Sequence, residues 1–293
     1  PYKVIISVSL NKDLDDEVLR TGSTLVRRNL IQAKWVANQI ALKRAIKKTS
    51  ASKIITFHSR VNLAKDFAGD DARGFKEHVS GFDVFHVNGS QNAADRKALL
   101  EGFKAAPKGL ITNARCLTEG VDVPAVDMVA FLSPRRSLVD IVQAIGRAMR
   151  NSPTTGKEFG YVLVPLFIDI AQGESIEDAV ARAQFDEVWD VIQTLQEQDE
   201  ALAELIQQMA ESKGRSGKFD ASGLEMIEFC GENIALDALI NSVSVRAFEE
   251  LFGNWDVRYG ELMQFKAEHG HCRVPQKKHL ANKRLGLWVS HQR

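Results

Sequence analysis

The residues Lys53-Ile-Ile-Thr-Phe57-His58-Ser59-Arg60 show the pattern that decides the fold of this 293-residue chain. A short, almost continuous apolar run ends at a polar turn, and a segment with helical character follows it. Further apolar runs of this kind begin at Tyr2, Val84, Leu110, Val126 and Tyr161. Short apolar strands that alternate with helices are typical of a parallel sheet with helices on both faces. The sequence therefore predicts an α/β fold.

Polar residues follow three of these runs, at the strand ends where ligands gather in parallel sheets. Besides His58-Ser59-Arg60, they are Asn88-Gly89 and the stretch from Thr112 to Pro124. Within that stretch, Gly120 lets a ligand approach the backbone closely, and Asp122 offers a carboxylate to a sugar hydroxyl or an arginine. A loop that only joins two strands is the alternative.

The stretch from Asp140 to Arg150 predicts a helix with an unusual polar side. At about 100° per residue, Gln143, Arg147 and Arg150 project within a narrow arc. Two guanidinium groups in such an arc suit phosphate, because they are planar and always charged. The solvated face of an ordinary amphipathic helix has the same pattern, so the neighbouring motifs must decide.

Taken together, the motifs resemble motifs IV, V and VI of superfamily 2 helicases in order and spacing. The matching segments are Phe57–Arg60, Thr112–Pro124 and Gln143–Arg150. Residues 52–165 resemble the second RecA-like domain of these enzymes, near the type III restriction and DEAD/DEAH-like branches. Gln143 stands where DEAD-box proteins carry His, and Ala144 where they carry Arg. This difference argues against a DEAD-box RNA helicase and favours a DNA translocase.

The resemblance implies roles for residues on both sides of the domain. Arg147 and Arg150 would be arginine fingers for ATP, Gln143 would approach the γ-phosphate, and Gly120 and Asp122 would line the nucleotide cleft. The residues that would face the nucleic-acid backbone are His58, Ser59, Arg60, Asn88, Gly89, Thr112 and Asn113. Such contacts read phosphates and not base sequence. For His58 and Asn88, a structural role is the alternative.

Two parts of an ATPase site are missing from the sequence. No G-x-x-x-x-G-K-[ST] run occurs, since Gly217-Lys218 is followed by Phe219, and no strand-like run ends in an Asp-Glu pair. The phosphate cradle and the carboxylate for Mg²⁺ are therefore expected in an N-terminal RecA-like domain of the full-length protein. We interpret this chain, which starts at Pro1, as a fragment that should not hydrolyse ATP alone.

Outside the RecA-like part, the expected elements are mainly helical. An acidic loop is expected at 13–17, and a long helix from Ser23 to Lys48 whose basic residues form a solvated face. Between Asp169 and Glu211, apolar residues at three-four spacing predict one long helix or a helical hairpin. Lys213–Lys218 predicts a flexible basic linker, and a further helix is expected at about 233–252.

The last stretch, from Trp255 to Arg293, contains eight basic and three acidic residues, interleaved with aromatic ones. This mixture is typical of nucleic-acid surfaces. Its spacing of Trp, Tyr, Leu and His-Gly resembles the helicase-associated repeat, whose final helix looks cut off at Arg293. The aromatic residues would form its core, and the binding face would include Lys277, Lys278, Lys283 and Arg284. A zinc site at His269, His271 and Cys272 is disfavoured, because no second ligand pair sits at finger spacing.

The composition narrows the class of protein. Lys and Arg total 38, as do Asp and Glu, so no global field indicates a nucleic-acid partner. Three scattered cysteines are too few for a disulfide framework, which favours a reducing compartment and a cytoplasmic location. No apolar run has membrane-spanning length, no signal peptide is recognised, and no membrane partner is expected.

We therefore predict a RecA-like parallel sheet flanked by helices, followed by an all-α C-terminal extension. The predicted domains are residues 1–168 (second RecA-like domain), 169–252 (helical extension) and 253–293 (helicase-associated domain). The predicted function is the C-terminal part of an ATP-dependent nucleic-acid helicase or translocase, with DNA favoured over RNA. ATP and Mg²⁺ would be held mainly by the absent domain. The alternative is a non-catalytic nucleic-acid-binding adaptor; a small-molecule enzyme lacks any acid/base or nucleophile constellation.

Overall fold

The structure is a computed structural model that describes most of the chain. The described residues are 2–21, 30–70, 74–114, 126–132, 159–175, 178–179, 186–197, 199–216, 226–231, 254–275 and 283–292. The chain divides into two compact units. The first comprises Pro1–Thr194 with Met226–Ile240, and the second Leu195–Glu225 with Asn241–Arg293.

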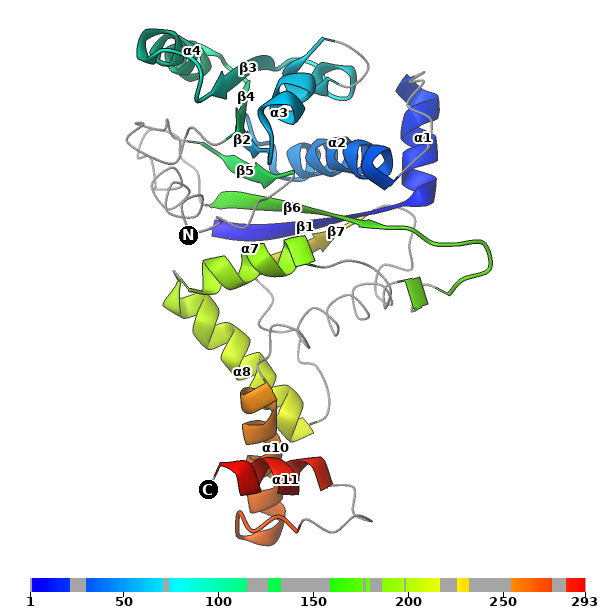
Figure 1. The fold of residues 1–293 in the computed structure, drawn as a ribbon, viewed down its shortest axis with the longest axis vertical. Helices are drawn as coiled ribbons and strands as arrows, with labels where there is room; N and C mark the ends of the chain where they lie inside the picture. Colours follow the sequence, from blue (N-terminus) through cyan, green and yellow to red (C-terminus); the bar gives the residue numbers. More distant parts are fainter. Residues whose placement is uncertain are drawn as a thin grey trace. The chain divides into compact units, whose positions relative to one another are not determined.

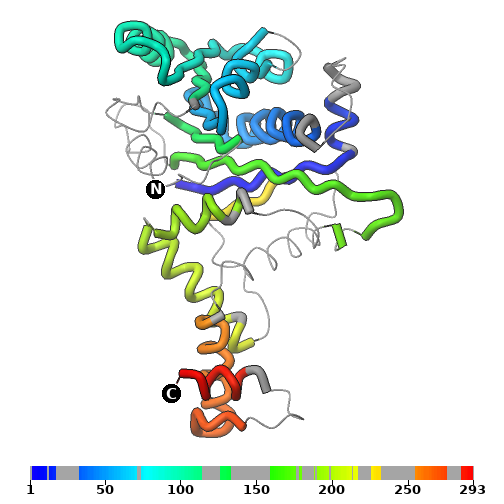
Figure 2. The backbone as a smooth tube through the Cα atoms, viewed as in Figure 1, coloured from blue at the N-terminus to red at the C-terminus, as the bar shows by residue number. Residues whose placement is uncertain are grey.

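The first unit is built on one parallel sheet with strand order β3-β4-β2-β5-β6-β1-β7 (Figure 1). Its strands are β1 (Tyr2–Leu10), β2 (Lys53–Phe57), β3 (Asp83–Asn88), β4 (Gly109–Ala114), β5 (Met128–Phe131), β6 (Gly160–Ile168) and β7 (Ile227–Cys230). The long strands β1 and β6 stay in register from Tyr2↔Gly160 to Leu10↔Ile168, and the two run side by side in Figure 2. The predicted parallel α/β sheet is confirmed, and six of its strands begin within a few residues of the apolar runs.

Helices cover the sheet because its strands are apolar on both faces. They include α2 (Leu30–Thr49), α3 (Val61–Ala68), the 3-10 turn η1 (Phe75–Glu77) and α4 (Ala93–Ala105). One buried cluster joins Leu42 of α2 and Phe67 of α3 to Ile54 and Leu110 of the sheet. On β3, Phe85 instead meets Phe103 of α4 edge to face at 6.1 Å. Because side chains alternate along a strand, the neighbouring His86 points to the face opposite Phe85.

The expected acidic loop at 13–17 is wrong, since these residues belong to α1 (Asn11–Thr21). The expectation of a wholly solvated basic face on the next helix is also wrong. Arg44 lies 2.8 Å from Asp13 with its side chain 11% exposed, and Lys43 lies 2.8 Å from Glu17. Both errors have one cause: α1 packs on α2, and two of its acidic side chains, Asp13 and Glu17, are paired by basic side chains of α2.

The expectation that 169–252 is purely helical missed β7, which pairs parallel with β1 at the end of the sheet. Lys3 of β1 and Lys48 of α2 reach Glu228 of β7 at 2.7 and 2.8 Å. A strand of four residues that contains a glutamate has no clear apolar signal, so pairing with β1 decides its conformation.

The described part of the acidic stretch includes α7 (Asp186–Gln196) and α8 (Glu200–Ser216) as separate helices, so a single long helix is excluded. Asp199 begins the second one, because its Oδ1 accepts hydrogen bonds from the backbone N–H groups of Ala201 (2.9 Å) and Leu202 (3.2 Å). The predicted flexible linker from Lys213 is wrong as far as Ser216, because α8 continues through these residues.

Gly214 lies within α8 at the point where α10 (Asn254–His269) crosses it at very close range. A Cβ on Gly214 would overlap the carbonyl oxygen of Val257 and lie 2.8 Å from the backbone nitrogen of Glu261. A Cβ on Gly260 would overlap the carbonyl oxygen of Glu211. Two glycines facing each other thus let the helix backbones touch, which a sequence pattern alone reads as a linker.

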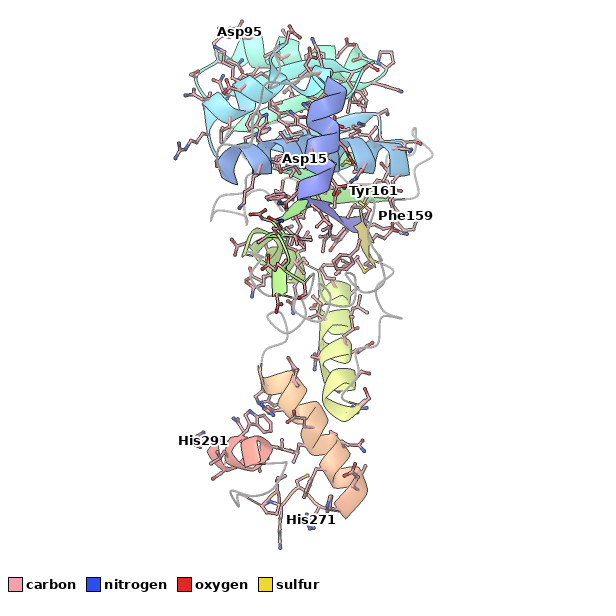
Figure 3. All side chains as sticks on the ribbon, turned by 90° about the vertical axis from the view of Figure 1, so that its right-hand side faces the viewer. Asp15, Asp95, Phe159, Tyr161, His271 and His291 are labelled. Carbon is pink, nitrogen blue, oxygen red and sulfur yellow. The ribbon has the colours of Figure 1, made fainter. Side chains whose placement is uncertain are left out.

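A small core holds the C-terminal part of the second unit together. Phe265 of α10, Val274 and Leu285 of α11 (Lys283–His291) are buried, and Trp288 packs against them. Trp255 stacks on Tyr259 at 5.2 Å, yet it remains 50% exposed. Figure 3 labels His271 just beyond α10 and His291 on α11. None of the described helices combines the length and hydropathy that a membrane span requires.

Candidate nucleic-acid interface

The sequence-predicted backbone contacts come together at one edge of the sheet. β4 pairs with β2 on one side and β3 on the other, and Asn113 is in register with both Phe57 and Val87. The three strands therefore end in one row, in the order β3, β4, β2. The backbone N–H of His58 donates to the carbonyl of Asn113 over 3.0 Å, which ties the turn after β2 to β4.

Four of the predicted side chains are buried at this edge and are called the buried polar floor below; they lie on both faces of the sheet, because Thr112 and Asn113 are consecutive residues of β4. Thr112 and Asn113 are fully buried, His58 is 6% exposed and Asn88 9% exposed. The Oγ1 of Thr56 lies 3.0 Å from Nε2 of His58, within hydrogen-bonding distance. These groups hold the strand ends in place, and the solvent-facing groups lie around them.

Burial also determines the charge of His58. Desolvation, with a further contribution from nearby His86, lowers the pKa of His58 to about 3. Its ring packs against Phe67 of α3 with centroids 5.0 Å apart. The imidazole is therefore neutral near pH 7 and supplies hydrogen bonding without positive charge.

The remaining predicted residues form an exposed rim above this floor. Arg60 and Gly89 are exposed and Ser59 is half-buried. Within the described part of the chain, Arg60 makes no ion pair, and a Cβ on Gly89 would meet no atom within 4 Å. A cation and an open stretch of backbone at one edge suit a phosphate chain that passes over it.

Two helices start at this rim and orient their free N–H groups toward it. Arg60 is the N-cap residue of α3, and Asn92 caps α4 by accepting from the backbone N–H of Asp95 at 2.8 Å. Helix N-termini favour anions because their first N–H groups lack intrahelical partners. Asp95, labelled in Figure 3, brings a negative charge to the first turn of α4 and limits this effect there.

The sequence interpretation missed three residues that shape the rim: His86, Ser90 and Gln91. Oε1 of Gln91 accepts from the backbone N–H of Asn88 at 3.0 Å, and its Nε2 donates to the carbonyl of His86 at 3.1 Å. The available signal was the polar pair His86 and Asn88 in the second half of β3, spaced to share one face.

The nucleotide side of the prediction lies outside the described residues. This applies to Gly120, Asp122, Gln143, Arg147 and Arg150, whose roles stay predictions. The side chains of the predicted C-terminal binding face also lie outside the described part of the chain; they are Lys277, Lys278, Lys283 and Arg284. Among the residues that the structure does describe, no three His, Cys, Asp or Glu side chains are grouped to hold a metal ion.

Comparison with known families agrees with the order of the two sequence resemblances. Residues 37–152 match the helicase conserved C-terminal domain, and residues 253–293 match the helicase associated domain.

Individual relatives match shorter stretches. The mitochondrial ATP-dependent RNA helicase MSS116 of Lodderomyces elongisporus is 32% identical over 87 residues, which is 30% of this chain and 12% of the relative. The UvrABC system protein B of Rhodopirellula baltica is 34% identical over 95 residues, 31% of this chain and 13% of that protein. The chain thus spans a small part of the relatives it matches.

A solved structure shares the fold over most of the chain. The ATP-dependent type ISP restriction-modification enzyme LlaBIII bound to DNA superposes with a TM-score of 0.64 over 86% of this chain and 17% of its own. At 24% identity, this likeness supports the RecA-like sheet with its helical extension.

Proposed function

We propose that this chain, which carries a helicase conserved C-terminal domain followed by a helicase associated domain, is the C-terminal part of an ATP-dependent DNA helicase or translocase. One observation carries the proposal: Arg60, Gly89 and the starts of two helices share one edge of a parallel sheet above a buried polar floor. Such an edge binds a sugar-phosphate backbone through charge and main-chain donors, and it leaves the bases unread.

The proposed division of labour places ATP between this chain and a domain that supplies the phosphate cradle. Arg147 and Arg150 would neutralise charge that develops on the transferred phosphoryl group, while Gln143 approaches the γ-phosphate. Gly120 and Asp122 would line the cleft. The group bound there would be ATP with Mg²⁺, held mainly by the other domain.

DNA is the proposed partner because of the sequence of the stretch from Asp140 to Arg150. Gln143 and Ala144 depart from the His and Arg of DEAD-box RNA helicases. The matched relatives include proteins named as RNA helicases and one named as a UvrABC component. A binding assay that compares the affinity for DNA and RNA strands of equal length and base sequence decides which polymer is preferred.

The proposed interface is tested by two variants of the rim and one matched control. Arg60→Ala should weaken binding of a labelled single strand and lower the slope of log K against log salt by about one, because one phosphate contact is lost. Gly89→Ala should weaken binding with an unchanged melting temperature, since its methyl group enters open space in the free chain.

The control is Lys108→Ala, because Lys108 is exposed and precedes β4, at the opposite end of the strands. Loss of one surface cation there should leave the salt slope within error of the parent chain. If Lys108→Ala and Arg60→Ala weaken binding equally, general electrostatics accounts for the affinity and this edge is not the interface.

A further inference from the structure

A chain of hydrogen bonds links the rim of the proposed interface to β4, the second strand of the sheet, and His86 of the edge strand β3 stands at its centre. Nδ1 of His86 lies 2.8 Å from Oγ1 of Thr112 on β4. Nε2 of His86 lies 3.1 Å from Nδ2 of Asn88. The other end of the Asn88 amide holds Ser90, whose backbone N–H lies 2.9 Å from Asn88 Oδ1 and whose hydroxyl also donates to it.

The donor and acceptor of each bond in this network follow from one group that can only donate. The backbone N–H of Ser90 can only donate, so the atom of Asn88 that faces it must be the oxygen. The amide nitrogen of Asn88 then faces His86 and donates to Nε2. Nε2 must therefore carry no proton, and His86 is the neutral tautomer with its proton on Nδ1, donated to Thr112.

The surroundings of His86 favour this neutral form. It lies on the α3 side of the sheet, where Lys65 of α3 is the charged neighbour and His58, after β2, the titratable one. Partial burial, assisted by Lys65, lowers the pKa of His86 below its ordinary value of 6.5. No carboxylate among the described residues is bonded to the ring.

We propose that His86 is a positioning residue, which holds the Asn88-Gly89-Ser90 turn in the shape that receives a nucleic-acid phosphate. When the His86 ring is protonated, it no longer holds this turn. This inference rests on the proposed function of the same edge. Protonation would turn Nε2 into a donor facing the amide N–H groups of Asn88, so that the bond between them is lost. Asn88 then loses its anchor, and so does the turn above it.

The expected pH dependence is opposite to the ordinary one. A histidine beside a phosphate ordinarily strengthens binding in acid, because the ring gains positive charge. Here the pKa of His86 is depressed, so the anchored turn is present at neutral pH and is lost only as the pH falls through that lowered pKa. The affinity for a single strand should drop by about three- to tenfold, the worth of one hydrogen bond.

The experiment measures fluorescence anisotropy of a labelled single-stranded oligodeoxynucleotide with the chain of residues 1–293, between pH 8 and pH 5 at constant salt. The parent should bind more weakly in acid. His86→Gln keeps an acceptor for Asn88 but cannot titrate, so its affinity at pH 8 should be near that of the parent and should not fall in acid. Parallel pH profiles for the two proteins would overturn the proposal.

A double-mutant cycle separates positioning from general damage to the fold. His86→Phe removes the acceptor and should weaken binding at every pH. In a chain that already carries Asn88→Ala, the same change should have no further effect, because His86 acts through Asn88. Additive losses would show that His86 matters for another reason. Circular dichroism melting of each variant identifies any that fails to fold, and His86→Gln then carries the test.

A nuclear magnetic resonance titration keeps this inference distinct from the proposed function. In the free chain, the Ser90 amide resonance should follow the titration of His86. Before it is protonated, the His86 ring should be the neutral tautomer with its proton on Nδ1. If this coupling is present but the oligonucleotide does not bind, the proposed function fails and the positioning device stands. If binding responds to Arg60→Ala while Ser90 ignores His86, the reverse is true.

Discussion

At the scale of single residues, the buried His58 gives a prediction about acid stability. Its pKa is about 3 in the folded chain and near 6.5 when unfolded, so the unfolded state binds more protons between these values. The free energy of unfolding should therefore be highest above pH 6.5 and fall by up to about 1.4 kcal/mol for each pH unit below it. Urea denaturation at pH 7.5, 6 and 5 measures this slope.

The matched variants are His58→Gln and His291→Gln. The first removes the buried titrating ring and should make the slope clearly shallower, with His86 supplying the remainder, although it also costs stability at neutral pH. The second alters an exposed histidine of α11 and should leave the slope unchanged. A slope that survives His58→Gln would assign the acid sensitivity to other groups.

At the scale of elements, the crossing of α8 and α10 predicts that a Gly→Ala substitution there lowers stability, whereas in most helices it raises stability. In a solvated helix, Gly→Ala stabilises by about 1 kcal/mol. Gly260→Ala should instead destabilise the second unit by about 1–3 kcal/mol, because the added methyl group overlaps the backbone of Glu211. Ala267→Gly is the control: Ala267 is exposed on the same helix, so its loss should cost no more than about 1 kcal/mol. Urea unfolding followed by tryptophan fluorescence measures both, and a stabilising Gly260→Ala would contradict the close crossing.

At the scale of the whole molecule, charge is distributed unevenly. The chain has equal numbers of acidic and basic residues, yet Trp255–Arg293 holds a surplus of five positive charges, eight less three. Deleting this stretch should weaken nucleic-acid binding and flatten its salt dependence, because fewer counterions are released. A salt slope that is unchanged by the deletion would mean that these charges are only solvated.

The catalytic prediction also belongs to this scale, because it needs the complete protein. Arg147→Ala or Arg150→Ala should lower kcat for ATP by on the order of a thousand-fold, with much less effect on ATP affinity, since a finger acts on charge that develops during transfer. Arg136→Ala is the nearby control. Equal damage from Arg136→Ala would refute the motif assignment, and a full-length protein without ATPase activity would favour the adaptor.

The alternation of apolar runs and helices was sufficient to predict the parallel sheet, because burying a strand on both faces demands nearly continuous apolar sequence. The same logic placed Arg60, Asn88 and Asn113 at strand ends, and parallel pairing brings such ends to one edge. Which of them face solvent was beyond the sequence. His58 and Thr112 carry the same kind of polar groups as Arg60 and Ser59, but neighbouring strands and α3 bury them.

By itself, then, the sequence determined the α/β class, six of the seven strands and the residues that gather at the sheet edge. Only the tertiary structure decided the helical state of Asp13 and Gly214, the return of β7 to the sheet, and the protonation of His86. Periodicity records which side chains avoid water along one element. Charge pairing between α1 and α2, backbone contact at Gly260 and the bond between His86 and Thr112 depend on partners far away in the chain, which no local pattern encodes.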